Sequence, residues 1–269
     1  MSLGRPVVIE ARGLGKVYGI DRAPIAALND ISFAVEEGSF VSLVGPSGCG
    51  KSTLLQILAG LVPSTAGEVL VDGVAVRQPA PEKISVMFQE ATLLPWKRVS
   101  DNVEFPLEIL GVKAGERRQR AAAMLSLVGL SEFAERYPHE LSGGMRQRVS
   151  IARALAPDPR IMLMDEPFGA LDEQTRIKMG HELLRIWEKT GKTIFFITHS
   201  LTEALFLADI VLVMSHRPGQ IVGTIKTDLP RPRTYEIIGS AEFGATRNRI
   251  WKLISQDDRE VNGKGMASL

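Results

Sequence analysis

One eight-residue segment constrains the fold of this chain more than any other. It is Gly45-Pro46-Ser47-Gly48-Cys49-Gly50-Lys51-Ser52, which matches G-x-x-x-x-G-K-[ST], follows an apolar run at 40–44 and opens a helical pattern at 51–59. Glycines let the backbone curl so that successive N–H groups point at one anion, and the helix start adds a favourable dipole. Lys51 supplies charge for outer phosphates, and the Ser52 hydroxyl is a hard ligand for Mg²⁺. A chance glycine-rich turn is the alternative, but the flanking strand and helix favour a phosphate-binding loop.

Short apolar runs alternate with helical patterns along the chain, which predicts an α/β fold with a largely parallel sheet. The strands are expected at 7–11, 31–35, 40–44, 69–71, 84–88, 161–164, 193–198, 210–214 and 221–225. Between 101 and 156 only helical patterns occur, clearest at 117–128 and 145–156, so we expect a helical subdomain inserted into the sheet domain. Further helices are expected at 173–190, ended by Gly191, after Ser200 with Glu203 in a capping box, and around 246–255.

The bulk composition restricts the cellular setting. The 269 residues are 45% apolar and 23% charged, with a net charge of +1, so no basic field indicates nucleic acid. No apolar run approaches the roughly 18 residues that span a bilayer, and the N-terminus lacks a signal-peptide pattern. The single cysteine, Cys49, allows no internal disulfide, as expected in a reducing cytosol. We therefore expect a cytoplasmic protein whose role at a membrane is peripheral.

Two adjacent carboxylates end a second apolar strand. Asp165 and Glu166 follow the run at 161–164, and in parallel sheets ligands bind at the carboxyl ends of strands. Neighbouring strand side chains point to opposite faces, so the two acids should have different tasks: Asp165 for hydrated Mg²⁺, Glu166 for polarising the attacking water. His199 ends the next apolar strand and should emerge at the same edge. A loop residue or helix cap is the alternative for this histidine.

Cys49 has two interpretations within the loop. A helix N-terminus favours the thiolate, but no histidine partner lies nearby in sequence, so a small loop residue is favoured over a nucleophile. We expect a thiol reagent to inhibit hydrolysis and ATP to protect.

The segment Leu141-Ser142-Gly143-Gly144-Met145 resembles the LSGGQ signature of the ATP-binding-cassette (ABC) transporter ATPases. It lies between the phosphate loop and Asp165-Glu166, in the order of that family. A serine N-cap followed by two glycines is also an anion-accepting helix start on physical grounds. The resemblance covers about residues 7–233 and departs at Met145, where the family has glutamine; methionine has no N–H to donate.

The resemblance implies a P-loop NTPase fold with a RecA-like, mostly parallel sheet core, an antiparallel β part and an inserted helical subdomain at about 90–156. The ATPase domain would span 7–233, with a C-terminal appendage at 234–269. In the family two copies form a head-to-tail dimer with ATP between them. Ser142, Gly143 and Gly144 would then contact the nucleotide held by the partner's loop.

The resemblance also assigns roles to single residues. ATP would be bound by Tyr18, Gly45, Pro46, Ser47, Gly48, Cys49, Gly50, Lys51, Ser52 and Thr53. Tyr18 matches the aromatic that stacks on adenine, although by itself it is one tyrosine near a strand end. Gln89 matches the glutamine that senses Mg²⁺ and the transport partner, and Asp172 matches the loop that links the two active sites. His199 matches the histidine that holds the γ-phosphate, so Glu166, His199 and Lys51 would be catalytic and Ser52, Gln89 and Asp165 would hold Mg²⁺.

The resemblance implies membrane partners as well. The segment 91–96, which ends in Trp96, matches the groove that receives a helix of the integral membrane permease, although a core excursion is the alternative. A periplasmic or lipid-anchored solute-binding protein would be an indirect partner, with the cassette on the cytoplasmic side of the cell membrane.

Met145, with the segments 215–219 and 228–233, resembles the nitrate, sulfonate and taurine importer branch. The second segment is expected to be a stiff, extended, basic connector. Alternatives are a different importer branch, an exporter cassette, a cassette acting on nucleic acid or the ribosome, and a small-molecule kinase with the same loop. No spanning helices, coiled-coil insertion or second cassette is evident, and a kinase has no use for 141–144.

Overall fold

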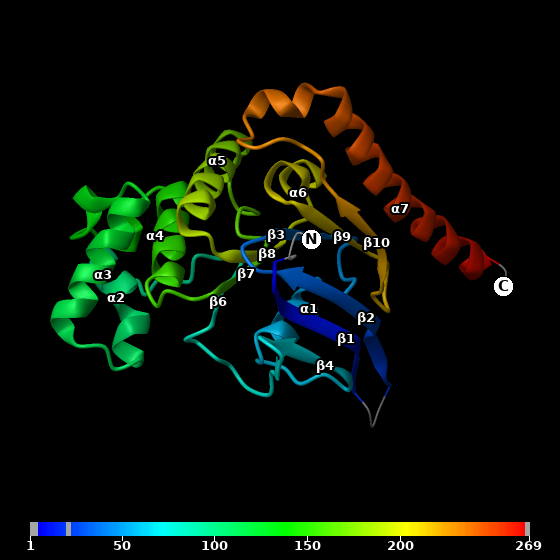
Figure 1. Ribbon diagram of the computed structural model, residues 1–269, viewed down its shortest axis with the longest axis horizontal. Helices are drawn as coiled ribbons and strands as arrows, with labels where there is room; N and C mark the ends of the chain where they lie inside the picture. The colour runs from blue at the N-terminus through cyan, green and yellow to red at the C-terminus, as the bar shows by residue number, and fades with distance from the viewer. Residues whose placement is uncertain (1–4, 20–22, 267–269) are drawn as a thin grey trace. The chain divides into compact units, whose positions relative to one another are not determined.

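The structure is a computed structural model that describes residues 5–19 and 23–266, with side chains up to Asp257. Figure 1 shows the ribbon of the chain, which divides into two compact units. The first unit combines Met1–Pro79 with Thr193–Leu269, and the second is Ala80–Lys192. The last three residues of the expected appendage, 267–269, lie outside the described residues.

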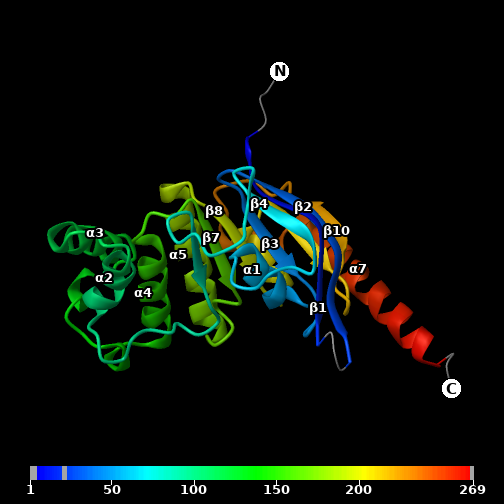
Figure 2. The ribbon, with the colours of Figure 1, turned by 90° about the horizontal axis from the view of Figure 1, so that it is seen from below.

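An antiparallel sheet with the strand order β2-β1-β4-β5 forms one layer of the first unit, and its long strands lie side by side in Figures 1 and 2. Its strands are β1 (Val7–Tyr18), β2 (Ile25–Glu36), β4 (Ala66–Val71) and β5 (Val74–Ala75). The first two strands are longer than expected, because β1 continues through Gly13, which has a φ of +55°, and through irregularities in its pairing with β2. Such bulges break the alternation that a strand prediction relies on.

The phosphate loop follows a fully buried strand of the same unit. This strand, β3 (Phe40–Val44), lies between β8 (Thr193–Ile197) and β9 (Ile210–Met214), parallel to both. The antiparallel β10 (Ile221–Lys226) pairs with β9. A strand with parallel neighbours on both sides is covered on both faces, which explains its continuous apolar sequence. The carboxyl ends of β3, β8 and β9 therefore share one edge.

Among its described residues, the first unit also contains three helices. They are α1 (Lys51–Leu58), α6 (Leu201–Leu207) and α7 (Ala241–Met266), with a 3-10 turn at Tyr235–Gly239. The Ser200 hydroxyl caps α6 by accepting from the Glu203 N–H at 3.3 Å, which is the first half of the predicted capping box, while the Ser200 backbone N–H donates to Thr198 Oγ1 at 3.0 Å. The helix expected at 246–255 is the middle of the longer α7, which contacts β9 and β10 before its C-terminal end extends beyond them (Figures 1 and 2).

The second unit contains two parallel strands, β6 (Ile84–Met87) and β7 (Ile161–Asp165). Between them lie only helical elements: α2 (Val99–Ile109), α3 (Ala114–Leu127), α4 (Gly143–Leu155) and two 3-10 turns, Ser131–Phe133 and Pro138–Glu140. Helix α5 (Glu173–Thr190) follows β7 and ends at Gly191, whose φ is +63°. The helical character of the 101–156 stretch agrees with its sequence pattern.

Candidate nucleotide-binding site

The phosphate loop has the backbone that its glycines permit. Gly48 and Gly50 have φ values of +74° and +108°, and Gly50 is the N-cap of α1. A Cβ on Gly50 would lie 2.8 Å from Leu28 Cδ2 and 2.9 Å from the Ala27 carbonyl oxygen, both on β2. The loop is therefore pressed against β2 with no room for a larger residue.

Lys51 closes the loop on itself. Its side chain is buried, and its Nζ donates to the carbonyl oxygens of Gly45 at 3.0 Å and Pro46 at 2.9 Å. The third partner of Nζ is the Cys49 sulfur at 4.0 Å, and since none of these three partners is a carboxylate, the ammonium group keeps its charge available for an anion. Ser52 is exposed in the first turn of α1, and Thr53 beside it is half-buried.

Cys49 is a buried part of this loop, 1% exposed. Burial raises the pKa of its thiol, and the nearby charge of Lys51, with Nζ 4.0 Å from the sulfur, opposes that shift without cancelling it. The thiolate that a helix N-terminus favours is therefore outweighed by desolvation. The interpretation of Cys49 as a small loop residue agrees with this environment.

His199 and Tyr18 belong to the same unit as the loop. His199 lies two residues beyond the end of β8 and is exposed, so it lies at the edge where β3 also ends. Tyr18 is the last residue of β1 and is 39% exposed, with Lys16 Nζ 4.9 Å from the centre of its ring. The Lys16 ammonium also donates to the Pro63 carbonyl oxygen at 2.7 Å.

The paired carboxylates lie in the second unit. Asp165 is the last residue of β7, and Glu166 adopts a left-handed backbone with a φ of +43°. A Cβ on Gly169 would lie 3.3 Å from both Gln89 Nε2 and the Glu166 carbonyl oxygen. Since β6 and β7 are parallel, the fold brings Gln89 and the two acids to one edge, as their positions after the strands predict.

The Ser142 hydroxyl caps α4 by accepting from the Met145 N–H at 3.3 Å, so this helix starts where the sequence predicts an anion-accepting end. A Cβ on Gly144 would lie 2.8 Å from Thr175 Cγ2, so a larger residue would push α4 away from α5. A cavity of about 270 Å³ opens here, lined by Ser142 and Met145 and by the cationic side chains of Arg148 and Lys178.

Asp172 occupies the N-cap of α5 and accepts from the Thr175 N–H at 3.0 Å. The hydrogen bond from the Thr175 side chain is the main reason why the pKa of Asp172 is lowered.

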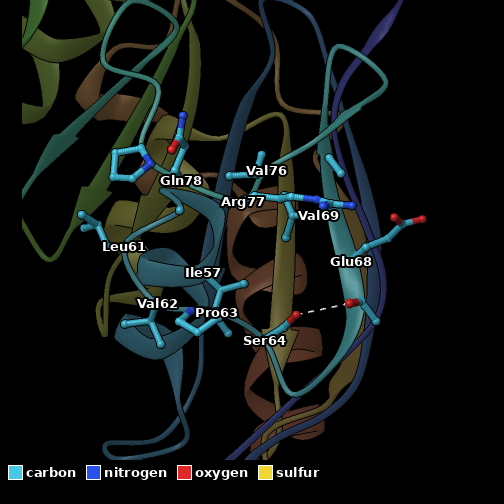
Figure 3. Close-up of a pocket in the computed structure, with 14 residues that line it drawn as sticks. Ile57, Leu61, Val62, Pro63, Ser64, Glu68, Val69, Val76, Arg77 and Gln78 are labelled. Carbon is cyan, nitrogen blue, oxygen red and sulfur yellow. Dashed lines mark hydrogen bonds between the residues drawn. The ribbon is translucent and has the colours of Figure 1, made fainter.

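A larger cavity, of about 600 Å³, lies at the opposite end of α1 from the phosphate loop (Figure 3). Its walls include Ile57, Leu61 and Val62 from the end of α1 onward, and Val69 and Arg77 from the β4–β5 region. Figure 3 shows these side chains around the hollow. None of the predicted nucleotide residues lines it, so it is separate from the phosphate loop.

Sequence reasoning missed one contact to the loop. Arg217, in the turn after β9, donates from Nε and Nη2 to the Gly48 carbonyl oxygen at 3.3 and 3.2 Å. The sequence contains a sign of this contact, namely a basic residue just after β9. Because β9 is a parallel neighbour of β3, residues that follow either strand lie at the same edge of the sheet as the loop. The connector 228–233 contains no helix or strand, and its Arg233 is only 4% exposed and turned into the fold, an orientation that the sequence prediction did not include.

Comparison with known proteins identifies the class. The family model described as ABC transporter matches residues 28–169, more than half of the chain. The chain belongs to the ABC transporter family. It is an ATP-binding cassette that hydrolyses ATP, and its α/β fold is that of the P-loop NTPases.

Individual relatives cover most of the chain. The taurine import ATP-binding protein TauB of Rhizobium johnstonii is 56% identical over 77% of this chain and 79% of its own length. The nitrate import ATP-binding protein NrtD of Synechocystis sp. is 43% identical over 94% of this chain and 97% of its own length. Among solved structures, the dimeric post-hydrolysis state of the ATP-binding cassette MJ0796 bound to ADP and Pi has a TM-score of 0.71 and 35% identity, over 81% of this chain and 98% of that chain.

Proposed function

We propose that this cassette is the ATP-hydrolysing subunit of an importer for a small anionic solute such as nitrate, a sulfonate or taurine. The observation that carries the proposal is the similarity to TauB and NrtD, which extends over most of each chain. Its partners are integral membrane permease subunits and, through them, a solute-binding protein. Within the described residues no helix is both long enough and apolar enough to cross a membrane. We assign the cassette a peripheral position on the cytoplasmic side.

The permease-binding surface is assigned to the segment after Gln89. Trp96 there is 72% exposed, while Arg153 holds the backbone by donating to the carbonyl oxygens of Ala91 and Thr92, each at 2.8 Å. Asn102 binds both backbone groups of Leu94. An exposed aromatic ring on an anchored backbone suits docking of a partner helix.

The working unit is a head-to-tail dimer of this chain, in keeping with the dimeric cassette of similar fold. The triphosphate lies between the loop 45–52 of one copy and Ser142, Gly143 and Gly144 of the other. Each helix start supplies N–H groups and a dipole, and Arg148 and Lys178 add positive charge beside the second one. ATP closes the dimer through its higher affinity for the closed state, and Asp172 links the two sites.

Mg²⁺ is assigned to Ser52, Gln89 and Asp165. These donors are hard oxygens, and the described residues contain no cluster of three or more His, Cys, Asp or Glu that could hold a metal alone. A few oxygen ligands completed by substrate phosphates are typical of Mg²⁺. The ion neutralises charge on the phosphates when bound.

The chain's own residues divide the remaining chemistry. Lys51 and His199 bind the γ-phosphate oxygens, and Glu166 orients and polarises the attacking water. Tyr18 stacks on adenine, and Gln89 and Asp172 couple the site to the permease and to the second site.

The variant Glu166→Gln tests this assignment. We expect it to bind ATP and to dimerise, measured by light scattering, while phosphate release falls by about 100-fold or more, the usual worth of a general base. Glu188→Gln, an exposed change on α5, is the matched control, and Lys51→Ala should lose ATP binding itself. Near-normal turnover of Glu166→Gln defeats the assignment.

Reconstitution tests transport. The cassette, its permease and the solute-binding protein in liposomes should take up labelled taurine or nitrate only with ATP on the cassette side. Turnover that ignores the permease and every candidate anion would contradict the importer proposal.

A further inference from the structure

The phosphate loop has an external anchor, Arg217. The turn between β9 and β10 places this guanidinium beside the loop, where two of its N–H groups bond the Gly48 carbonyl oxygen at 3.3 and 3.2 Å. A Cβ on Gly48 would lie 3.5 Å from Nη2, so the side chain lies against the loop backbone. The guanidinium is a charged donor, but Arg217 is exposed and both distances are long, so the contact adds a modest restraint to the loop.

The contact fixes the direction of one amide of the loop. The peptide between Gly48 and Cys49 is planar, so its carbonyl and its N–H point in opposite directions when it is trans. With the carbonyl held by Arg217, the Cys49 N–H points the other way, toward the Pro46 carbonyl oxygen at a long 3.4 Å and toward its own sulfur. An N–H with such weak partners is suited to bind a phosphate oxygen.

The same turn is bound from its other side by α7. Asp257 Oδ2 accepts from the backbone N–H of His216 and lies 2.8 Å from His216 Nδ1. Both side chains are mostly covered, 29% exposed for His216 and 20% for Asp257. His216 and Arg217 are adjacent, so a movement of α7 at Asp257 displaces the residue that holds the loop.

The turn and the helix are both seated firmly. Gly219 exchanges backbone hydrogen bonds with β2, to the Ala27 carbonyl at 2.9 Å and from the Asn29 N–H at 3.0 Å. On α7, Leu253 packs so closely that a Cβ on Gly223 of β10 would lie 2.5 Å from its Cδ1. Helix α7 therefore sits directly on the backbone of the hairpin that carries Arg217.

We propose that Arg217 is a positioning residue for the phosphate loop and that Asp257 of α7 holds it in place, so that the C-terminal helix sets the affinity of the loop for nucleotide. The path is Asp257 to His216, Arg217 and the Gly48 carbonyl. Neither residue touches the reacting atoms. Their effect falls on nucleotide binding and not on the chemical step.

The first test is Arg217→Gln in the full chain. We expect the Kd for ATP, measured by calorimetry, and the KM of hydrolysis to rise roughly three- to tenfold, the loss of one charge-assisted hydrogen bond. The kcat at saturating ATP should stay within about twofold. Arg217→Lys, which keeps a charge and a donor, should recover part of the affinity, and Arg249→Gln, an exposed arginine on α7, should bind like the wild type.

The second test is Asp257→Ala, with Glu242→Ala on the exposed first turn of α7 as control. The Kd for ATP should rise in Asp257→Ala. In the double variant Asp257→Ala/Arg217→Gln the fold increase in Kd should be smaller than the product of the two single increases, because both residues act through one contact. Circular dichroism and melting without nucleotide show that each variant is folded.

An unchanged Kd in folded Arg217→Gln, or a fall in kcat with unchanged KM, overturns the role of Arg217. Independent, multiplicative effects in the double variant overturn the connection to α7. Neither result affects the Glu166 assignment, which is tested by turnover in a protein that still binds ATP.

Discussion

The buried guanidinium of Arg233 joins the end of α6 to the chain that follows the last strand. One Nη donates to the carbonyl oxygens of Leu205, Phe206 and Ala208 at 3.1, 3.1 and 2.7 Å. The other donates to Thr227 Oγ1 at 3.0 Å. Carbonyls at a helix C-terminus have no partner inside the helix, and a cation there is favoured by the helix dipole.

Replacement of Arg233 by methionine, of similar length, removes all of these bonds. The Ala208 carbonyl keeps the Thr227 hydroxyl as a donor at 2.7 Å, whereas the Leu205 and Phe206 carbonyls lose the bond from Arg233. Each buried carbonyl left without a donor costs about 1–3 kcal/mol, while release of a buried charge returns part of that cost. Burial lowers the pKa of Arg233 to about 10, so the group is still charged at neutral pH. We expect a net loss of about 3–5 kcal/mol in the free energy of unfolding, as for other broken buried charge networks.

Urea denaturation followed by circular dichroism measures this loss. Arg231→Met is the control with fewer buried bonds: that side chain is 22% exposed, pairs with Asp209 at 2.8 Å and donates to the Leu207 carbonyl oxygen at 2.8 Å, so its removal should cost about 1–3 kcal/mol. An Arg233→Met variant no less stable than the Arg231→Met control would refute the reasoning, since the carbonyls would then have found other partners.

Two further predictions concern Asp172 and Cys49. The pKa of Asp172 is lowered, chiefly by the Thr175 side chain, so its stabilising effect is complete above its ordinary pKa and lost as pH falls through the lowered one. Melting temperatures between about pH 5 and about pH 2 should fall less in Asp172→Asn, which keeps an accepting oxygen; an equal fall in both proteins would exclude this. The buried Cys49 thiol should react with iodoacetamide far more slowly in the folded than in the unfolded protein, more slowly still with ATP, and its modification should stop hydrolysis. Undiminished turnover of fully labelled protein, or a Cys49→Ala variant without activity, would show that the small-loop-residue interpretation is wrong.

The strands and helices with a single clear period could be predicted from the sequence. The run at 40–44 is β3, and 173–190 is α5, because continuous burial and a capped helix both leave local patterns. Helix α2 was not located, since Pro106 inside it removes a helical hydrogen bond and disguises the pattern. The first strand was predicted only to residue 11, because Gly13 interrupts its alternation.

Some residues of the candidate site could likewise be predicted from local sequence patterns, and others could not. Lys51, Asp165 and Ser142 could be placed because each follows from a short motif at the end of a strand or the start of a helix. The contact of Arg217 with the loop joins residues 169 positions apart, and only the parallel pairing of β3 with β9 brings them together. The burial of the Arg233 side chain likewise depends on carbonyl groups at the end of α6, and no local sequence pattern predicts that contact.

The left-handed backbone of Glu166 has a consequence for how this enzyme could change. A non-glycine residue in that conformation stores strain of order 1–3 kcal/mol, and Glu166→Gln keeps the strain while removing the carboxylate. The substitution Glu166→Gly would remove the backbone strain and the carboxylate at the same time. If Glu166 polarises the attacking water as proposed, Glu166→Gly would therefore raise the stability of the cassette while removing its ATP hydrolysis.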